Sequence, residues 1–178
     1  MGDFNWLVTL NLFILYKESV MKIAGAHVVF HRFLSTGKDK KCEKNFIQAV
    51  LLCKRTQDAP VHPGYWSLIG GVLEDREDPQ DAVLREVEEE LEIINYQLQA
   101  MEELRDVEII RKDGPLLIRY FKSHLDVGMD RLRLKWNKKE KKVEGEGLGW
   151  FTAEEVHHLM MRPEDCIAVE YFFQANGV

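Results

Sequence analysis

The sequence lacks the features that mark secreted, membrane-spanning and nucleic-acid-binding proteins. It has only three cysteines in 178 residues, none of them in a C-x-x-C pair, and an odd number cannot all form internal disulfides, which favours the cytoplasm. The apolar stretch at residues 4–16 is shorter than the about 20 residues of a membrane span, and no basic segment precedes it as in a signal peptide. The 24 basic residues are outnumbered by 30 acidic ones, so nucleic acid is not an expected partner.

Internal repeats and Gly/Ser-rich linkers are also missing from the sequence. A length of 178 residues with 46% hydrophobic residues is typical of one globular domain with a substantial core. We therefore predict a single domain over residues 21–178. Residues 1–20 would be an N-terminal extension, an added strand or helix that covers the core or the second subunit of a homodimer.

Strand-like and helix-like segments alternate along this domain, which predicts an α/β or α+β fold. Asp78-Pro79, Thr152 and Pro163 are typical helix starts. The first helix should extend to Leu91 or Glu92, the second to about residue 161 and the last to about residue 174. The expected strands are residues 21–34, 46–55, 96–101, 107–111, 116–125, 131–136, with Trp136 pointing inward, and 147–151.

The acidic residues are concentrated in one segment. Residues 74–92 contain ten acidic and two basic residues, a net charge of −8, whereas the other 159 residues sum to +2. The formal net charge of −6 for the whole chain therefore comes from this one loop and helix.

A helical projection sorts the side chains of this segment into two groups. At roughly 100° per residue, an apolar stripe is flanked on one side by three carboxylates. The stripe is Val83, Leu84, Val87 and Leu91, and the carboxylates are Glu86, Glu89 and Glu90. Like charges one turn apart repel by roughly a few tenths of a kcal/mol, and a divalent cation would reverse that sign. Since Mg²⁺ prefers oxygen ligands, this flank is a candidate metal site; a solvated acidic face is the alternative.

The residues around this helix carry a recognisable motif. From Gly71 the chain reads glycine, five residues, Glu77, seven residues, Arg85-Glu86-Val87, one residue, Glu89-Glu90, one residue and Glu92-Ile93. This segment resembles the Nudix box, G-x5-E-x7-R-E-U-x-E-E-x-G-U with U aliphatic, and departs from it only at Glu92, which replaces the last glycine. Because a left-handed residue other than glycine costs about 1 kcal/mol or more, Glu92 predicts either strain or a different helix end.

The resemblance implies the Nudix fold, an α/β/α sandwich around a mixed β-sheet, and it gives roles to individual residues. The metal ligands of the family match Glu86, Glu89, Glu90 and the carbonyl of Gly70. An ion pair that fixes the loop to the helix matches Glu77 and Arg85. The implied cofactor is Mg²⁺, with Mn²⁺ as a substitute.

The resemblance also implies the reaction, which is hydrolysis of a pyrophosphate bond in a nucleoside diphosphate linked to another moiety. The attacking water would lose its proton to Glu89, to Glu90 or to a later carboxylate such as Glu146. An ADP-ribose-type member would be expected to carry a proline after the box, where this chain has Glu108 and Ile109. The expected substrate is therefore a nucleoside triphosphate or a nucleotide-sugar. A non-catalytic Nudix-like nucleotide-binding or sensor domain is the alternative.

Three further residues are candidates for contact with this small-molecule substrate. Lys54 and Arg55 lie at the end of a predicted strand before the box, where they could contact phosphates. Tyr65 could line the cleft beside His62 and stack on a base, with ordinary packing as the alternative.

Overall fold

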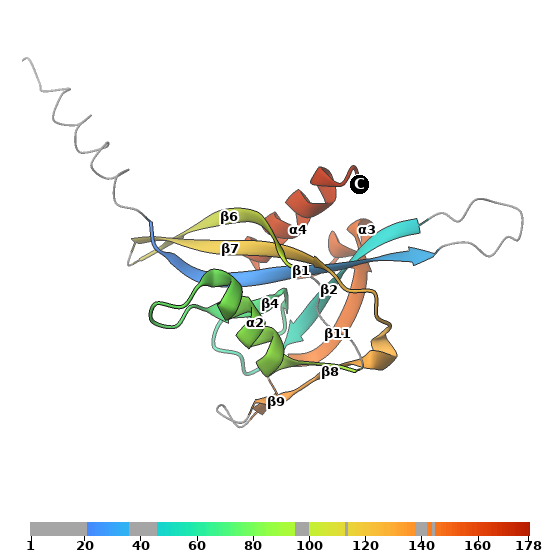
Figure 1. Ribbon diagram of the computed structural model, residues 1–178, viewed down its shortest axis with the longest axis horizontal. Helices are drawn as coiled ribbons and strands as arrows, with labels where there is room; N and C mark the ends of the chain where they lie inside the picture. Colours follow the sequence, from blue (N-terminus) through green and yellow to red (C-terminus); the bar gives the residue numbers. More distant parts are fainter. Residues whose placement is uncertain (1–20, 36–45, 95–99, 113, 138–141, 144) are drawn as a thin grey trace, which may run out of the picture.

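A mixed β-sheet of seven strands forms the centre of the structure, a computed structural model that describes residues 21–35, 46–94, 100–112, 114–137, 142–143 and 145–178 (Figure 1). In chain order the elements are β1 (Ile23–Ser35), β2 (Phe46–Arg55), β3 (Trp66–Ser67), β4 (Ile69–Val72), α2 (Pro79–Glu90), β5 (Leu91–Ile93), β6 (Glu102–Arg111), β7 (Gly114–His124), a 3-10 helix η1 (Met129–Arg131), β8 (Leu132–Leu134), β9 (Trp136–Asn137), β10 (Lys142–Val143), β11 (Gly145–Thr152), α3 (Ala153–Val156) and α4 (Pro163–Ala175).

The central sheet has the strand order β11-β2-β1-β7-β6, with β3 beside β2 and β4 beside β1. β1 is parallel to β7 but antiparallel to β2 and β4, so the sheet is mixed. The pairing of β4 with β1 places Gly70 opposite His27 and Gly71 opposite Ala26. This register brings the two glycines that precede α2 to the middle of the sheet.

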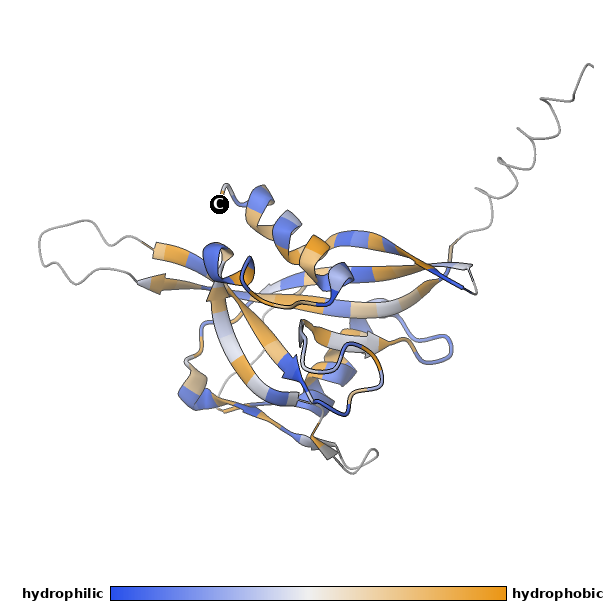
Figure 2. Ribbon diagram, turned by 180° about the vertical axis from the view of Figure 1, so that it is seen from behind, coloured by the Kyte–Doolittle hydropathy of each residue, from blue (hydrophilic) through white to orange (hydrophobic). Residues whose placement is uncertain are grey.

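Helices cover both faces of the sheet. Successive side chains of a strand point to opposite faces, so neighbouring residues of β1 pack against different helices. Phe30 of β1 packs with Val83 and Val87 of α2 on one face, whereas Val29 packs with Phe172 of α4 on the other. In Figure 1, α2 lies on one side of the sheet and α4 on the other, and Figure 2 shows hydrophobic stretches along the strands between them. The predicted α/β/α sandwich around a mixed sheet is confirmed.

Helix α2 begins as predicted but ends earlier than predicted. Asp78 is its N-cap and accepts a hydrogen bond from the Gln80 amide at 2.8 Å, with Pro79 in the first turn. The helix ends at Glu90, because Leu91 already has an extended backbone (φ −117°, ψ 137°). Glu92 then pairs with Arg133 across β5 and β8. The chain thus passes directly from the helix into a strand. Glu92, which replaces the last glycine of the box, therefore does not need a left-handed backbone conformation.

The helix after Thr152 is much shorter than predicted. Thr152 and Glu155 form a reciprocal capping box, yet α3 ends at Val156. The chain then forms backbone hydrogen bonds with the sheet. The Trp66 amide donates to Met160 O at 2.8 Å, and the Arg162 amide donates to Trp66 O at 3.0 Å. These two bonds with β3 replace the helical ones that would have continued α3.

Two side chains that were predicted to point inward are exposed. Leu84 is 40% exposed and Trp136 is 61% exposed. Leu84 lies at the edge of the apolar stripe, beyond the part of α2 that contacts the sheet. Trp136 lies in β9, which among the described strands pairs with β10 alone, in a small separate sheet, and the strand predicted over residues 131–136 is reduced to β8 and β9.

Some predictions concern residues outside the described ranges. They include the N-terminal extension at residues 1–20, Cys42, and most of the strand predicted at residues 96–101. The two described cysteines, Cys53 and Cys166, are free thiols, and burial raises the pKa of Cys166 to about 11. In the described part of the chain, no helix is long and apolar enough to cross a membrane.

Candidate active site

A cavity of about 780 Å³ joins α2 to the start of α4, a size that suits a small-molecule ligand. Part of its wall is formed by the glycine loop and α2, through Gly70, Gly71, Val72, Glu74, Arg85, Glu86, Glu89 and Glu90. The rest is formed by the end of β2, the loop after it, β6 and the start of α4, through Arg55, Val61, His62, Ile109, Arg111, Arg162 and Glu164. The wall is therefore mainly acidic along α2 and contains both signs of charge elsewhere.

The three carboxylates that share a flank of α2 all line the cavity. Glu86 lies closest to the glycine loop, since a Cβ atom added to Gly71 would come within 2.2 Å of Glu86 Oε1. The absence of a side chain at Gly71 thus makes the room that the Glu86 carboxylate occupies.

Gly70 is required by its backbone conformation as well as by its neighbours. Its φ is +144°, and an added Cβ would lie 2.3 Å from Ala26 O and 2.6 Å from His27 Cα. Only glycine tolerates this geometry. Gly70 therefore lets the loop lie directly against β1 while its backbone lines the cavity.

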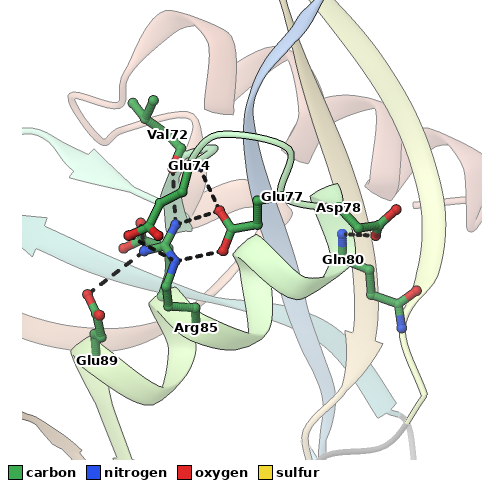
Figure 3. Close-up of polar contacts among 8 residues, drawn as sticks. Val72, Glu74, Glu77, Asp78, Gln80, Arg85 and Glu89 are labelled. Atoms are coloured by element: carbon green, nitrogen blue, oxygen red, sulfur yellow. Dashed lines mark hydrogen bonds and ion pairs between the residues drawn. The ribbon is translucent and has the colours of Figure 1, made fainter.

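Arg85 ties the loop to the helix, as Figure 3 shows. Its Nε and Nη2 donate to the two carboxylate oxygens of Glu77 at 2.8 and 3.0 Å, and Nη2 also donates to Val72 O at 3.1 Å. Nη1 donates to Glu86 Oε1 at 2.8 Å and lies 3.9 Å from Glu89 Oε2. The hydrogen bonds that Arg85 donates to Glu77, and then the one it donates to Glu86, raise the pKa of Arg85, so its charge is permanent.

The donor set of α2 and the glycine loop fits a hard divalent cation. Carboxylate oxygens and a backbone carbonyl are the ligands that Mg²⁺ prefers, and Gly70, Glu86, Glu89 and Glu90 line the same cavity. Among the described residues, no three His, Cys, Asp or Glu side chains are already arranged to hold a metal. In this arrangement Glu86 Oε1 accepts its hydrogen bond from Arg85 Nη1.

The other predicted site residues divide into two groups. Arg55 lines the cavity, but Lys54, Tyr65 and Glu146 are not among the described residues that do so. Adjacent residues of a strand point to opposite sides, which separates Lys54 from Arg55. Glu146 instead accepts a hydrogen bond from the Gln57 amide at 2.9 Å and lies 4.0 Å from Lys54 Nζ.

Several residues of the cavity wall, among them residues of β6 and α4, are absent from the sequence-based predictions. Ile109 and Arg111 come from β6, and Arg162 and Glu164 come from the start of α4. The only local signal was Pro163, which indicates a helix start and nothing about a ligand. These residues reach the cavity through long-range pairing of segments that the sequence does not reveal.

A buried polar cluster lies behind Arg162 and Glu164. The carboxylate of Asp165 is fully buried and accepts hydrogen bonds from Tyr120 OH at 2.9 Å and from the Leu68 amide at 3.1 Å. Its Oδ2 also lies 3.7 Å from Arg162 Nε, and its Oδ1 lies 3.6 Å from His27 Nδ1. Burial lowers the pKa of His27 to about 4, so His27 is neutral and Arg162 carries the compensating charge.

A model of the NUDIX domain family matches residues 29–172. The chain belongs to the Nudix family. The nucleoside triphosphatase NudI of Escherichia fergusonii is 51% identical over 43 residues, which are 24% of this Nudix chain and 30% of that relative. The match thus spans less than a third of the length of this curated relative.

Solved Nudix structures resemble the whole fold. The MutT NUDIX hydrolase from Burkholderia pseudomallei is 25% identical with a TM-score of 0.58, over 84% of this chain and 98% of that one. The NUDIX domain of Shewanella oneidensis NrtR, solved with ADP ribose, is 15% identical with a TM-score of 0.60, over 99% of both chains. The resemblance of the box to the Nudix family is therefore confirmed.

Proposed function

We propose that this Nudix protein is a Mg²⁺-dependent pyrophosphohydrolase. Its substrate would be a nucleoside diphosphate linked to another moiety, either a nucleoside triphosphate or a nucleotide-sugar. The observation that carries this proposal is the cavity of about 780 Å³, which is lined both by Glu86, Glu89, Glu90 and the glycine loop and by Arg55 and Arg111.

The residues of α2 and the loop would hold the cation. Glu86, Glu89, Glu90 and the Gly70 carbonyl supply oxygen ligands, and the bonds of Arg85 to Glu77 keep the loop against the helix. When bound, Mg²⁺ would neutralise charge on the diphosphate and make the attacking water more acidic.

Side chains would carry out proton transfer and phosphate binding. Water oxygen would attack a phosphorus atom in line, its proton would pass to the carboxylate of Glu89 or Glu90, and the bond from phosphorus to the leaving phosphate oxygen would break. Arg55 and Arg111 would donate hydrogen bonds to phosphate oxygens, because guanidinium groups match phosphate geometry. Positioning and electrostatics would supply most of the rate, as in phosphoryl transfer generally. Glu146 bonds to Gln57 away from the cavity wall, which favours the α2 carboxylates as the base.

The test is a Mg²⁺-supplemented hydrolysis screen over nucleoside triphosphates and nucleotide-sugars, with Glu89→Gln as the inactive variant. Loss of the carboxylate should lower kcat by about 100-fold or more. Glu88→Gln is the matched control, since Glu88 is exposed on the other side of the same helix, and it should retain full activity. Absence of phosphate or pyrophosphate release from every substrate would reject the proposal, and nucleotide binding without turnover would indicate a binding domain instead.

The compartment and assembly are proposed on separate grounds. The free thiols of Cys53 and Cys166 support a reducing compartment, for which we propose the cytoplasm. A homodimer, in which residues 1–20 cover a second subunit, stays a prediction that the solution mass of the full chain would test.

A further inference from the structure

Glu146 lies at an irregular point of the central sheet. In the pairing of β11 with β2, Gly145 lies opposite Arg55 and Gly147 lies opposite Lys54, so Glu146 is an extra residue in β11. Such a β-bulge redirects the side chain of the extra residue, and bulges are common next to functional sites. Here the bulge lies beside the end of β2, where the chain leaves the sheet.

The carboxylate of Glu146 holds the start of the loop that connects β2 to β3, which we call the cavity loop (residues 56–65). Its Oε1 accepts a hydrogen bond from the Gln57 amide at 2.9 Å, and its Oε2 lies 4.0 Å from Lys54 Nζ. The side chains of Glu146 and Lys54 are 37% and 39% exposed, and exposed ion pairs contribute little. The hydrogen bond to the Gln57 amide is therefore the contact through which Glu146 acts on the loop.

Gln57 in turn connects the two ends of the cavity loop. Its side chain packs against Gly64, since a Cβ atom added to Gly64 would come within 2.6 Å of Gln57 Nε2. Thr56 O accepts hydrogen bonds from the amides of Ala59 and Gly64, both at 3.2 Å. The loop is thus closed on itself, and the position of Gln57 determines the position of the whole loop.

The cavity loop also holds a cationic side chain of the cavity wall. Val61 and His62 of the loop line the cavity, as does Arg55. Arg55 Nε donates to Val61 O at 3.0 Å, and the Arg55 amide donates to Tyr65 O at 2.9 Å. Because a guanidinium group is planar and has its five N–H donors in a fixed arrangement, the bond from Nε to the loop also sets the direction of Nη1 and Nη2.

Under the proposed function, on which this inference rests, Arg55 contacts the phosphates of the substrate. We propose that Glu146 is a positioning residue for substrate binding. By holding the Gln57 amide it fixes the cavity loop, and through Val61 O it orients the guanidinium group of Arg55. A phosphate contact of this kind is made in the substrate complex as well as in the transition state, so Glu146 should affect KM and not kcat.

The first test compares Glu146→Ala and Glu146→Gln on the nucleotide that the screen shows to be hydrolysed fastest. Glu146→Ala removes the acceptor of the Gln57 amide and should raise KM about 3- to 10-fold, with kcat within about twofold of the wild type. Glu146→Gln keeps an acceptor oxygen, so its KM should stay within about twofold of the wild type. Glu154→Ala, at an exposed position of α3, is the control and should keep the wild-type KM.

A double-mutant cycle shows whether Glu146 acts through Arg55. If it does, Glu146→Ala should raise KM by less than about twofold when Arg55 is already alanine, because the two changes remove the same contact. If Glu146 only supports the fold, its substitution should raise KM by the same factor with and without Arg55.

Three results in these kinetics would overturn the inference. One is an unchanged KM in Glu146→Ala, and another is an equal effect of Glu146→Ala in both backgrounds of the cycle. The third is a loss of kcat of about 100-fold or more in Glu146→Gln, since that is the result expected for a general base.

Calorimetric binding of inorganic pyrophosphate with Mg²⁺ separates this inference from the proposed function. If the wild type hydrolyses no nucleotide but Glu146→Ala binds pyrophosphate at least about threefold more weakly than the wild type and Glu146→Gln do, the positioning role stands and the activity falls. Turnover with an unchanged KM in Glu146→Ala would leave the activity standing and reject the positioning role. In a protein without turnover, equal binding by all three, or no binding by any, would also reject it.

Discussion

The two helices that border the cavity place their acidic side chains in different surroundings. α2 places Glu86, Glu89 and Glu90 along the cavity wall, where Arg85 donates to Glu86 and lies 3.9 Å from Glu89. α4 begins with Glu164 and Asp165, whose carboxylates are buried or nearly so and are bonded to donors of the protein. We expect the acids of α2, which face the cavity, to bind a cation, whereas those of α4 are held by Arg162 and by buried donors and fix the shape of the wall.

The difference has an energetic consequence. Like charges on the flank of α2 repel only weakly in water, so their removal should change the free energy of unfolding little. Removal of a buried carboxylate with fixed donors should lower the free energy of unfolding much more, because those donors stay buried without an acceptor. Stability should thus depend on α4 and metal binding on α2.

The largest expected effect is at Asp165. Asp165→Ala leaves Tyr120 OH and the Leu68 amide without their acceptor and removes the fully buried one of the two carboxylates beside Arg162, which should lower the free energy of unfolding by about 3–5 kcal/mol. Urea unfolding measures this change. Glu89→Gln, on the flank of α2, is the matched carboxylate change and should stay within about 0.5 kcal/mol of the wild type. A loss of less than about 1 kcal/mol for Asp165→Ala would contradict the contrast between the helices.

The next effect tests a titratable group that α4 covers. The ring of His31 lies 5.0 Å from that of Phe172, and its pKa is lowered to about 4 by burial, by His124 and by Lys122, against an opposing effect of Glu102. Because folded His31 binds a proton less readily than unfolded His31, the free energy of unfolding should fall as the pH drops from about 6.5 toward 4.

The measurement for His31 is urea unfolding at pH 7 and at pH 5. The partly exposed ring should contribute about 1–2 kcal/mol to the difference between these pH values. His31→Gln should remove that contribution, and the exposed His158→Gln should not. An equal difference in wild type and His31→Gln would show that other groups cause the pH dependence.

These two helices also show what the sequence could predict. The site on α2 depends on local spacing, so the flank of Glu86, Glu89 and Glu90 and the Asp78 cap were predictable from the residues themselves. The wall from α4 depends on partners far away in the chain, since Asp165 bonds to Leu68 and Tyr120. No periodicity or motif in the sequence predicts such long-range pairings.

The end of α2 illustrates the same limit within a single motif. Glu92 departs from the box, and local rules predicted either strain or a different helix end. The structure resolves this through Arg133, which pairs with Glu92 in the β5–β8 sheet and lies 41 residues later. A long-range strand pairing, rather than a capping residue, determines where the helix stops.

A smaller effect is expected at the glycine loop, on metal binding. Gly71→Ala places a Cβ against the Glu86 carboxylate and should displace it, which should weaken Mg²⁺ binding about tenfold in calorimetry. Gly147→Ala is the matched control, because nothing lies within 4 Å of a Cβ added there. Unchanged Mg²⁺ affinity in Gly71→Ala would show that Glu86 does not need this space to bind the cation.

The smallest effect is expected at the start of α2, where the two helices differ once more. Asp78 caps α2 through the Gln80 amide, whereas Arg162 makes no side-chain cap bond to α4. Asp78→Ala should therefore lower the free energy of unfolding by about 1 kcal/mol, measured by urea unfolding. Asp75→Ala removes an exposed acid of the same loop and should cost less than about 0.5 kcal/mol. Equal effects of the two changes would mean that loss of acidic charge, and not loss of the cap bond, sets the stability of this helix start.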